Sequence, residues 1–221
     1  MKLRRPVACA IFDLDGVLLD TEHFYTAVTQ EICGEYGKVF DWSIKRNMIG
    51  RPSLESAEYL VDALSLPISP REYLSRRTRR LEELFPMADE QAGAEAFTRA
   101  LAAAAVPLAV ATSSERHLFE LKTRRHRDWF SIFDAIVVGD DPRVKAGKPA
   151  PDIFLVAAES LGIEPCRCVV FEDAPAGLEA ALAAGMQVIA LPDPAMAREP
   201  YAAADIVIER FSDLAPADLG W

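Results

Sequence analysis

The sequence lacks a hydrophobic run long enough to cross a membrane. Its longest apolar stretches, such as Ala100–Val106 and Val188–Leu191, fall far short of the ~20 residues that a spanning helix needs. Residues 1–6 are basic but lead directly into an apolar segment without a cleavage site, so we expect no signal peptide and a cytoplasmic protein. Internal repeats and low-complexity tracts are also missing. A chain of 221 residues with this profile can bury a sizeable core.

Cysteine and positive charge are also scarce. Only four cysteines occur, and Cys166 and Cys168 have no second pair or nearby histidine, so a structural zinc site is not expected. Lysine and arginine number 24 against 34 acidic residues, a net charge of −10. Such a balance argues against a nucleic-acid-binding surface, which would need a basic stripe, and a site for an anionic substrate must supply its positive charge locally. We expect a monomer with no nucleic-acid or membrane partner.

Short apolar runs typical of buried strands alternate with helical segments along most of the chain. The expected strands are 8–12, 107–112, 135–138, 168–171, 187–191 and 205–208. The expected helices between them are 94–105, 114–130, 152–161 and 176–184. This alternation is typical of a parallel sheet with right-handed crossovers. The predicted fold class is therefore α/β, a three-layer Rossmann-like core.

One segment interrupts that pattern, because no strand is predicted between residues 17 and 85. Helices are expected at 21–36, 53–64 and about 70–85 instead, while 39–48 is ambiguous. Ser69 followed by Pro70 marks the start of the third helix. We therefore predict an all-helical cap domain at 17–86, inserted into a catalytic core made of 1–16 and 87–221.

Polar side chains gather where the predicted strands end. They are Asp13 and Asp15 after the first strand, Thr112, Ser113 and Ser114 after the second, Lys148 before a helix, and Glu172 and Asp173 after the fourth. A buried strand has no structural use for an Asp-x-Asp pair at its end, where unpaired charge is costly. In a parallel sheet the carboxyl ends share one edge, where ligands bind. We expect these side chains to converge there.

Converging carboxylates need cations, since like charges a few ångströms apart cannot all stay ionised. Lys148 offsets only one charge, and a hard divalent ion with oxygen ligands, Mg²⁺, is the natural complement. The hydroxyls and backbone N–H groups of 112–114 suit a phosphate group. An aspartate can itself attack phosphorus and form an aspartyl-phosphate. This set of residues predicts phosphoryl transfer on a small phosphate ester.

The same residues resemble the four motifs of the haloacid dehalogenase superfamily, in order and over essentially the whole chain. The motifs are Asp13-Leu14-Asp15-Gly16-Val17-Leu18, Thr112, Lys148 and Phe171-Glu172-Asp173-Ala174-Pro175-Ala176-Gly177. The resemblance implies that Asp13 is the nucleophile and that Asp15 is the general acid and then the base. It further implies a Mg²⁺ site made of Asp13, the Asp15 carbonyl, Glu172 and Asp173. Thr112 would bond the phosphoryl group, and Lys148 would offset its charge.

Within that superfamily the chain most resembles pseudouridine 5′-phosphatases and glycerol-phosphate phosphatases. The alternative is a sugar-phosphate mutase similar to β-phosphoglucomutase, which uses basic cap residues to hold a second phosphate. Aligned on Gly50, those positions are Ile49 and Ser53, and the mutase's cap histidine falls on Tyr25, so a phosphatase is preferred. Tyr25 and Arg51 are the cap residues expected to contact the leaving group, with Ser113 and Ser114 as further substrate-binding residues. A binder that has lost turnover is a third reading.

Two other groups of charged residues can each be interpreted in two ways, as part of the site or as ordinary surface structure. Asp140 and Asp141 follow a predicted strand, so they either brace Lys148 or a metal-bound water, or form a plain turn. Five arginines on one predicted helix either attract phosphate esters or line a solvated face, which we favour. These arginines are Arg71, Arg76, Arg77, Arg79 and Arg80.

Overall fold

The computed structural model describes residues 3–49 and 53–221. The chain forms two compact units, one of Met1–Asp20 with Ala88–Trp221 and one of Thr21–Met87. We call them the core unit and the helical unit. Among the described residues, no helix is both long and apolar enough to cross a bilayer.

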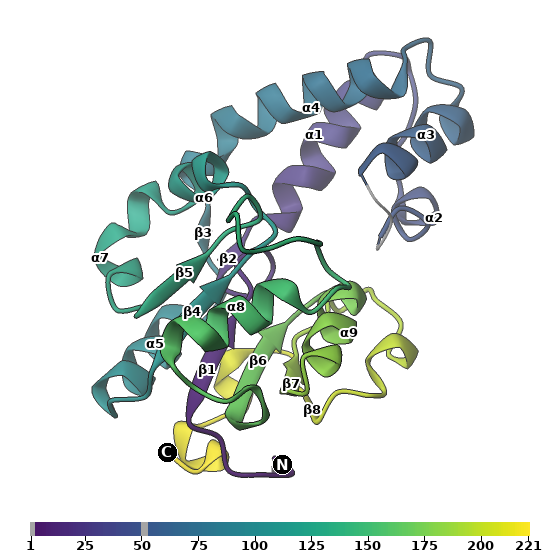
Figure 1. Ribbon diagram of the computed structural model, residues 1–221. Helices are drawn as coiled ribbons and strands as arrows, with labels where there is room; N and C mark the ends of the chain where they lie inside the picture. Colours follow the sequence, from purple (N-terminus) through teal and green to yellow (C-terminus); the bar gives the residue numbers. More distant parts are fainter. Residues whose placement is uncertain (1–2, 50–52) are drawn as a thin grey trace. The chain divides into compact units, whose positions relative to one another are not determined.

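A six-stranded parallel sheet forms the centre of the core unit, in the order β5-β4-β1-β6-β7-β8 (Figure 1). The strands are β1 (Cys9–Phe12), β4 (Leu108–Ala111), β5 (Ala135–Val137), β6 (Cys168–Glu172), β7 (Gln187–Ala190) and β8 (Ile206–Val207). The helices of this unit are α5 (Ala94–Ala103), α6 (Arg116–Lys122), α7 (Arg127–Phe130), α8 (Asp152–Leu161) and α9 (Pro175–Ala183). The predicted α/β fold class is confirmed.

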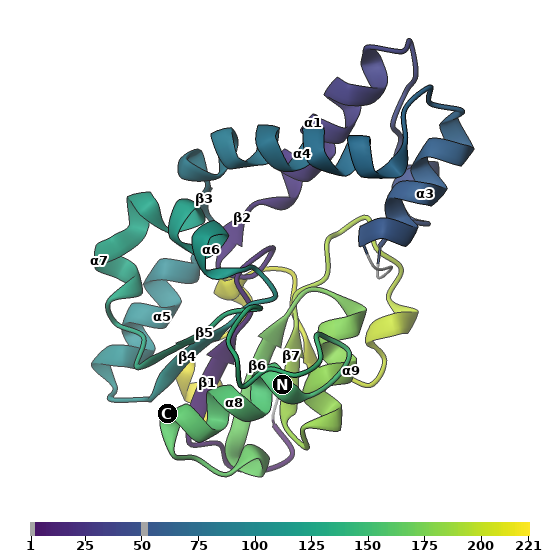
Figure 2. The same cartoon turned by 45° about the horizontal axis from the view of Figure 1, so that its top comes forward.

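Layers of side chains cover both faces of the sheet. Alternate residues of a strand point to opposite faces, and Cys9 and Ile11 of β1 belong to a core cluster with α8 and α9, which lie together on one face (Figure 1 and Figure 2). On the other face Phe12 stacks on Phe171 at 4.4 Å, and the ring of Phe97, from α5, lies 5.6 Å from Phe171. Because both faces are buried, the central strands read as continuous apolar runs.

The sequence predicts that the first segment of the core ends at residue 16. In the structure the first segment of the core unit extends four residues further, to Asp20. Residues 17–19 are fully buried, and the backbone of Leu18 accepts a 2.8 Å hydrogen bond from Gln91 N–H. Leu19–Asp20 then forms strand β2, which pairs antiparallel with β3 (Asp89–Glu90). The expectation that no strand occurs between 17 and 85 was therefore wrong. Two residues are too few to give a pattern, and they pair with Glu90 and Asp89, far along the chain.

The helix expected at 114–130 is also wrong, since it is divided into three. Helix α6 ends at Lys122, a 3₁₀ turn covers Arg124–His126, and α7 begins at Arg127. At the break the buried hydroxyl of Thr123 donates to the Phe119 carbonyl at 2.8 Å. Such a bond from threonine to the preceding turn competes with the regular helix ladder.

The helical unit contains α1 (Glu22–Gly34), α2 (Trp42–Lys45), α3 (Ser53–Leu64) and α4 (Pro70–Leu84). Helix α4 starts as predicted, because the Ser69 hydroxyl accepts the Glu72 N–H at 3.2 Å and Pro70 occupies the first turn. Helices α1 and α3 both pack on α4, and Thr29 of α1 bonds Tyr73 of α4 at 2.9 Å. The ambiguous stretch 39–48 contains α2, which the Asp41 side chain caps.

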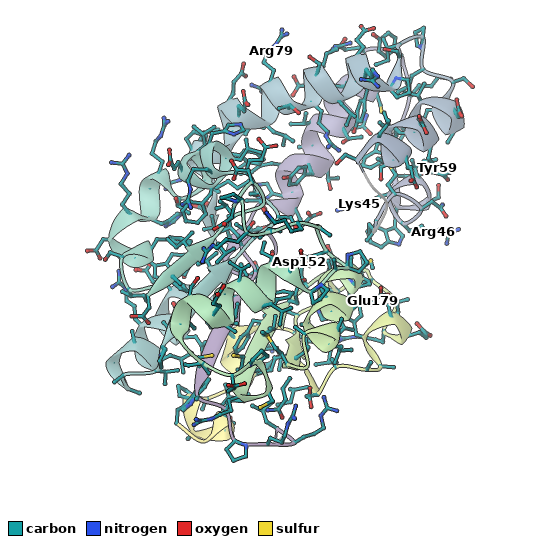
Figure 3. The ribbon with its side chains drawn as sticks, in the orientation of Figure 1. Lys45, Arg46, Tyr59, Arg79, Asp152 and Glu179 are labelled. Carbon is teal, nitrogen blue, oxygen red and sulfur yellow. The ribbon has the colours of Figure 1, made fainter. Side chains whose placement is uncertain are left out.

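The five arginines of the predicted basic run lie on α4, where several are paired. Arg76 bonds Glu35 and the Tyr36 hydroxyl, and Arg80 bonds Glu31 and Glu83. Arg79 projects from the exposed side of the helix (Figure 3). These contacts favour the solvated face over a phosphate-attracting patch.

Candidate phosphoryl-transfer site

The candidate site begins at the carboxyl end of β1. Asp13 continues the strand, and its N–H donates to the Phe171 carbonyl of β6 at 3.0 Å. The chain then turns sharply at Gly16, whose φ of +79° favours glycine and whose N–H bonds the Leu19 carbonyl at 2.8 Å. This turn places the Asp13 carboxylate at the sheet edge and leaves it almost completely buried.

Lys148 forms hydrogen bonds with residues of both the first and the last predicted motif. Its Nζ atom donates to Asp13 Oδ1 at 2.5 Å and to Glu172 Oε1 at 2.6 Å. All three side chains are nearly sealed from solvent, with exposed fractions of 8% for Lys148, 9% for Asp13 and 2% for Glu172. Three residues far apart in the sequence therefore meet in one buried charge cluster.

The loop that carries Lys148 is held by Asp152, the first residue of α8. The Asp152 carboxylate accepts the backbone N–H groups of Lys145 at 2.9 Å and Ala146 at 3.0 Å (Figure 3 labels Asp152). The Lys148 ammonium also lies 4.8 Å from the centre of the ring of Phe154, in the first turn of α8. Helix α8 thus fixes the direction from which Lys148 enters the site.

Burial dominates the electrostatics of the cluster. It raises the pKa of the Asp13 carboxyl to about 7, since Lys148 lowers that pKa by less than burial and the neighbouring carboxylates raise it. Burial lowers the pKa of Lys148, but Asp13 and Glu172 outweigh it and raise the pKa above its ordinary value. One lysine is therefore too little positive charge to keep this nucleophile fully ionised at neutral pH.

Three carboxylates form a group able to hold a metal ion. Asp13, Glu172 and Asp173 each offer one oxygen, and these oxygens lie within 4.8 Å of one another. All-oxygen ligands suit Mg²⁺. Burial and, to a lesser extent, the neighbouring carboxylates raise the pKa of Asp13 despite Lys148, so a further positive charge would be favourable here. The residues present therefore fit the predicted cation.

Two glycines allow these carboxylates to come so close. A Cβ atom at Gly177 would lie 1.7 Å from Glu172 Oε1, and one at Gly16 would lie 2.3 Å from Asp173 Oδ2. Both distances are far below van der Waals contact, so a side chain at either position would displace a candidate ligand. The glycines of the first and last motifs are thus required by the shape of the acidic group.

The Asp15 carboxylate has different partners. Its oxygens accept hydrogen bonds from Lys122 Nζ at 2.6 and 2.8 Å and from Ser114 Oγ at 3.0 Å. The side chain does not belong to the acidic group defined by Asp13, Glu172 and Asp173. The predicted contact of Asp15 with Mg²⁺ was assigned to its backbone carbonyl, so it stays a prediction.

The hydroxyl residues after β4 lie at the same sheet edge. The buried Thr112 hydroxyl accepts the Ser114 N–H at 3.0 Å, which bends the chain before α6. Ser113 is exposed. Ser114 donates its hydroxyl to Asp15, so the structure gives this predicted substrate-binding residue a protein partner.

Lys122 is the residue of this site that the sequence reasoning missed. It is the last residue of α6 and is fully buried, yet it stands in a basic stretch that reads as a solvated surface. One feature of the sequence does indicate that Lys122 is buried. It lies three residues after the apolar Phe119, and this spacing places both side chains on the inner face of the helix.

Asp140 and Asp141, predicted either to support the site or to form a turn, have partners outside the acidic group. Asp140 accepts the Arg116 N–H at 2.8 Å. Asp141 pairs with Arg143 at 2.8 Å, and this bond lowers the pKa of Asp141 to about 2. These contacts favour the turn reading over a brace for Lys148.

Tyr25 and Arg51 are the two predicted cap residues. Tyr25 belongs to the helical unit, where its ring lies 5.8 Å from the Phe85 ring. Arg51 lies outside the described residues.

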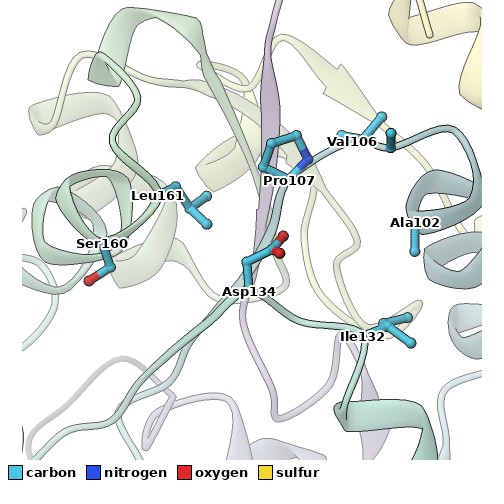
Figure 4. A pocket seen from close by; sticks show the side chains of 8 residues that line it. Ala102, Val106, Pro107, Ile132, Asp134, Ser160 and Leu161 are labelled. Atoms are coloured by element: carbon cyan, nitrogen blue, oxygen red, sulfur yellow. The ribbon is translucent and has the colours of Figure 1, made fainter.

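A separate cavity of about 440 Å³ opens at the opposite edge of the sheet (Figure 4). Pro107 and Asp134 line it directly before β4 and β5, at the amino ends of these strands. In open parallel sheets ligands bind outside the carboxyl ends. The cavity is therefore distinct from the candidate site.

Comparison with known protein families identifies the class of protein to which this fold and site belong. A model of the haloacid dehalogenase-like hydrolase family matches residues 7–185, and the chain belongs to this family. The resemblance inferred from the motifs is confirmed.

Curated relatives and a solved structure agree with this family. The chain is 42% identical to (DL)-glycerol-3-phosphatase 1, mitochondrial, from Arabidopsis thaliana, over 98% of this chain and 74% of the relative. It is also 42% identical to a probable pseudouridine-5′-phosphatase from Drosophila melanogaster, over 99% and 96%. A family hydrolase from Deinococcus radiodurans with bound phosphate and sodium superposes with a TM-score of 0.80 at 31% identity, covering 97% of each chain.

Proposed function

We propose that this protein is a Mg²⁺-dependent phosphatase that hydrolyses a small phosphomonoester through an aspartyl-phosphate on Asp13. The observation that carries the proposal is the buried Asp13–Lys148–Glu172 cluster at the carboxyl edge of the sheet. A nucleophilic carboxylate beside a fixed cation and hydroxyl donors is the arrangement phosphoryl transfer requires. Membership of a hydrolase family and relatives named phosphatases support the same conclusion.

Asp13, Glu172 and Asp173 would hold the Mg²⁺ ion, together with the Asp15 carbonyl that the resemblance assigns. When bound, the ion supplies positive charge that the phosphoryl oxygens need in the transition state. Lys148 supplies a second positive charge, which lies beside the attacking Asp13 carboxylate. The N–H groups of Thr112 and Ser114 already donate within the protein. The Thr112 hydroxyl and the Ser113 N–H are the neutral donors offered to the remaining phosphoryl oxygens.

The reaction runs in two steps. A carboxylate oxygen of Asp13 attacks phosphorus, the ester P–O bond breaks, and Asp15 gives its proton to the departing oxygen. A water molecule then attacks the phosphorus of the aspartyl-phosphate and passes a proton to Asp15. The bond between Asp13 and phosphorus breaks, inorganic phosphate leaves, and Asp13 is restored.

The helical unit is proposed to act as a cap that closes over bound substrate and limits water during the first step. Tyr25 and Arg51 remain the residues proposed to contact the leaving group. The enzyme is proposed to be a cytoplasmic monomer. Relatives named for glycerol 3-phosphate and pseudouridine 5′-phosphate support a small polar phosphate ester as the substrate.

Phosphate release from a panel of metabolite esters, with Mg²⁺ and with chelator, tests the proposal. We expect release only with Mg²⁺, and expect glycerol 3-phosphate or pseudouridine 5′-phosphate to be among the best substrates. Transfer of label between sugar positions in the presence of a bisphosphate would identify a mutase instead. Binding of esters without release would identify a protein that has lost turnover.

A further inference from the structure

Asp15 is held by two donors that belong to the protein rather than to a substrate. Lys122 reaches both carboxylate oxygens, at 2.6 and 2.8 Å, and it also lies 2.9 Å from Ser114 Oγ. Ser114 in turn donates to Asp15 Oδ2 at 3.0 Å. The three side chains form a closed triangle of hydrogen bonds.

The two charged members differ in exposure. The Lys122 side chain is 0% exposed, whereas the Asp15 side chain is 22% exposed. Lys122 therefore has no surface with which to touch a substrate, and any effect on catalysis must pass through Asp15. A buried ion pair adds little to stability compared with apolar packing, so stability alone is a poor reason for a lysine at this place.

We propose that Lys122 and Ser114 are positioning residues for Asp15, an inference that rests on the proposed function. Their bonds hold the carboxyl group in one rotamer at the sheet edge. When the proton of Asp15 moves to the departing oxygen and the P–O bond breaks, Asp15 becomes a carboxylate, and the Lys122 ammonium stabilises the new negative charge. This help matters only when the leaving group needs that proton.

Two substrates with different leaving groups test the proposal. Glycerol 3-phosphate releases an alkoxide, which must be protonated, while p-nitrophenyl phosphate releases a nitrophenolate, which departs without a proton. The value of kcat/KM reports the steps up to departure of the leaving group. For Lys122→Met we expect kcat/KM to fall about 100-fold with glycerol 3-phosphate and less than about fivefold with p-nitrophenyl phosphate.

Two further variants complete the experiment. Ser114→Ala removes a single hydroxyl from the same carboxylate, so it should cause a smaller loss, of about tenfold, with the same preference for glycerol 3-phosphate. It also keeps the test decisive if Lys122→Met does not fold. Thr123→Val is the matched control, since it removes the bond to the Phe119 carbonyl in the same helix without touching Asp15. We expect it to leave the ratio of the two kcat/KM values unchanged.

Equal losses with both substrates in Lys122→Met or Ser114→Ala would overturn the inference, as would the same selective loss in Thr123→Val. These results leave the proposed function intact, because the wild-type protein still hydrolyses both esters. Failure of the wild-type protein to release phosphate from p-nitrophenyl phosphate and from every ester of the metabolite panel in the presence of Mg²⁺ refutes the proposed function, and the inference with it.

Discussion

Replacing Gly177 with alanine should disable the acidic group without removing any of its members. The new Cβ atom would lie 1.7 Å from Glu172 Oε1 and 2.0 Å from Cδ. Ordinary contact begins near 3.4 Å, so the carboxylate must retreat by about 1.7 Å. Its bonds to Lys148 Nζ at 2.6 Å and to the Ala174 N–H at 2.8 Å would then exceed hydrogen-bonding distance.

The cost follows from those two bonds. Each hydrogen bond to a charged group contributes about 1.5–3 kcal/mol, and partial hydration of the displaced carboxylate recovers some of this. We therefore expect Gly177→Ala to lower the free energy of unfolding by about 3 kcal/mol. Because Glu172 is also a candidate metal ligand, the Kd for Mg²⁺ should rise at least about tenfold, or 1.4 kcal/mol.

Urea unfolding with and without Mg²⁺ measures the first quantity, and calorimetric titration of Mg²⁺ measures the second. Gly34→Ala is the matched control: outside the backbone of its own helix, the one described atom within 4 Å of the added Cβ is Gln30 Nε2, at 3.6 Å. Alanine should be neutral or stabilising there by up to about 1 kcal/mol. Wild-type stability and Mg²⁺ affinity in Gly177→Ala would refute the reasoning about this close approach.

Three further predictions concern the metal and its surroundings. Chelation of Mg²⁺ should abolish phosphate release, and Mg²⁺ at 100 times its Kd should raise the free energy of unfolding by about 2.7 kcal/mol; unchanged urea midpoints would argue against a bound ion. Lys148→Met should destabilise the metal-free protein by about 3–5 kcal/mol, because Asp13 and Glu172 lose their shared cation. Mg²⁺ should therefore raise the Tm of this variant more than that of the wild type, and an equal shift would contradict this. Tyr201→Phe, which removes the 2.5 Å bond to the Asp173 carbonyl, should cost about 1–2 kcal/mol in urea unfolding with kcat nearly unchanged.

The parts of the structure that could be predicted from sequence are those with a strong local pattern. Apolar runs identify the six strands of the sheet, and parallel strands bring their carboxyl ends to one edge. That rule alone led to the expectation that Asp13, Lys148 and Glu172 would meet, and their atoms lie 2.5 and 2.6 Å apart. Ser69 and Pro70 likewise identify the start of α4 from local chemistry.

The missed features depend on partners distant in the sequence. Lys122 reads as a surface lysine until Asp15, 107 residues away, is placed beside it. Strand β2 has two residues and exists through its pairing with β3. The break of the predicted helix after Lys122 depends on one side-chain bond from Thr123 to the backbone. No periodic pattern of apolar residues carries such information.

The central claim is that Asp13 attacks phosphorus and carries the phosphoryl group between the two steps. Rapid mixing with substrate and Mg²⁺, followed by acid quenching and mass spectrometry of peptides, measures this directly. We predict a phosphorylated peptide containing Asp13 that appears before phosphate is released and is lost in Asp13→Asn. Release of phosphate with no modified Asp13 peptide at any time, or wild-type turnover by Asp13→Asn, would contradict the account.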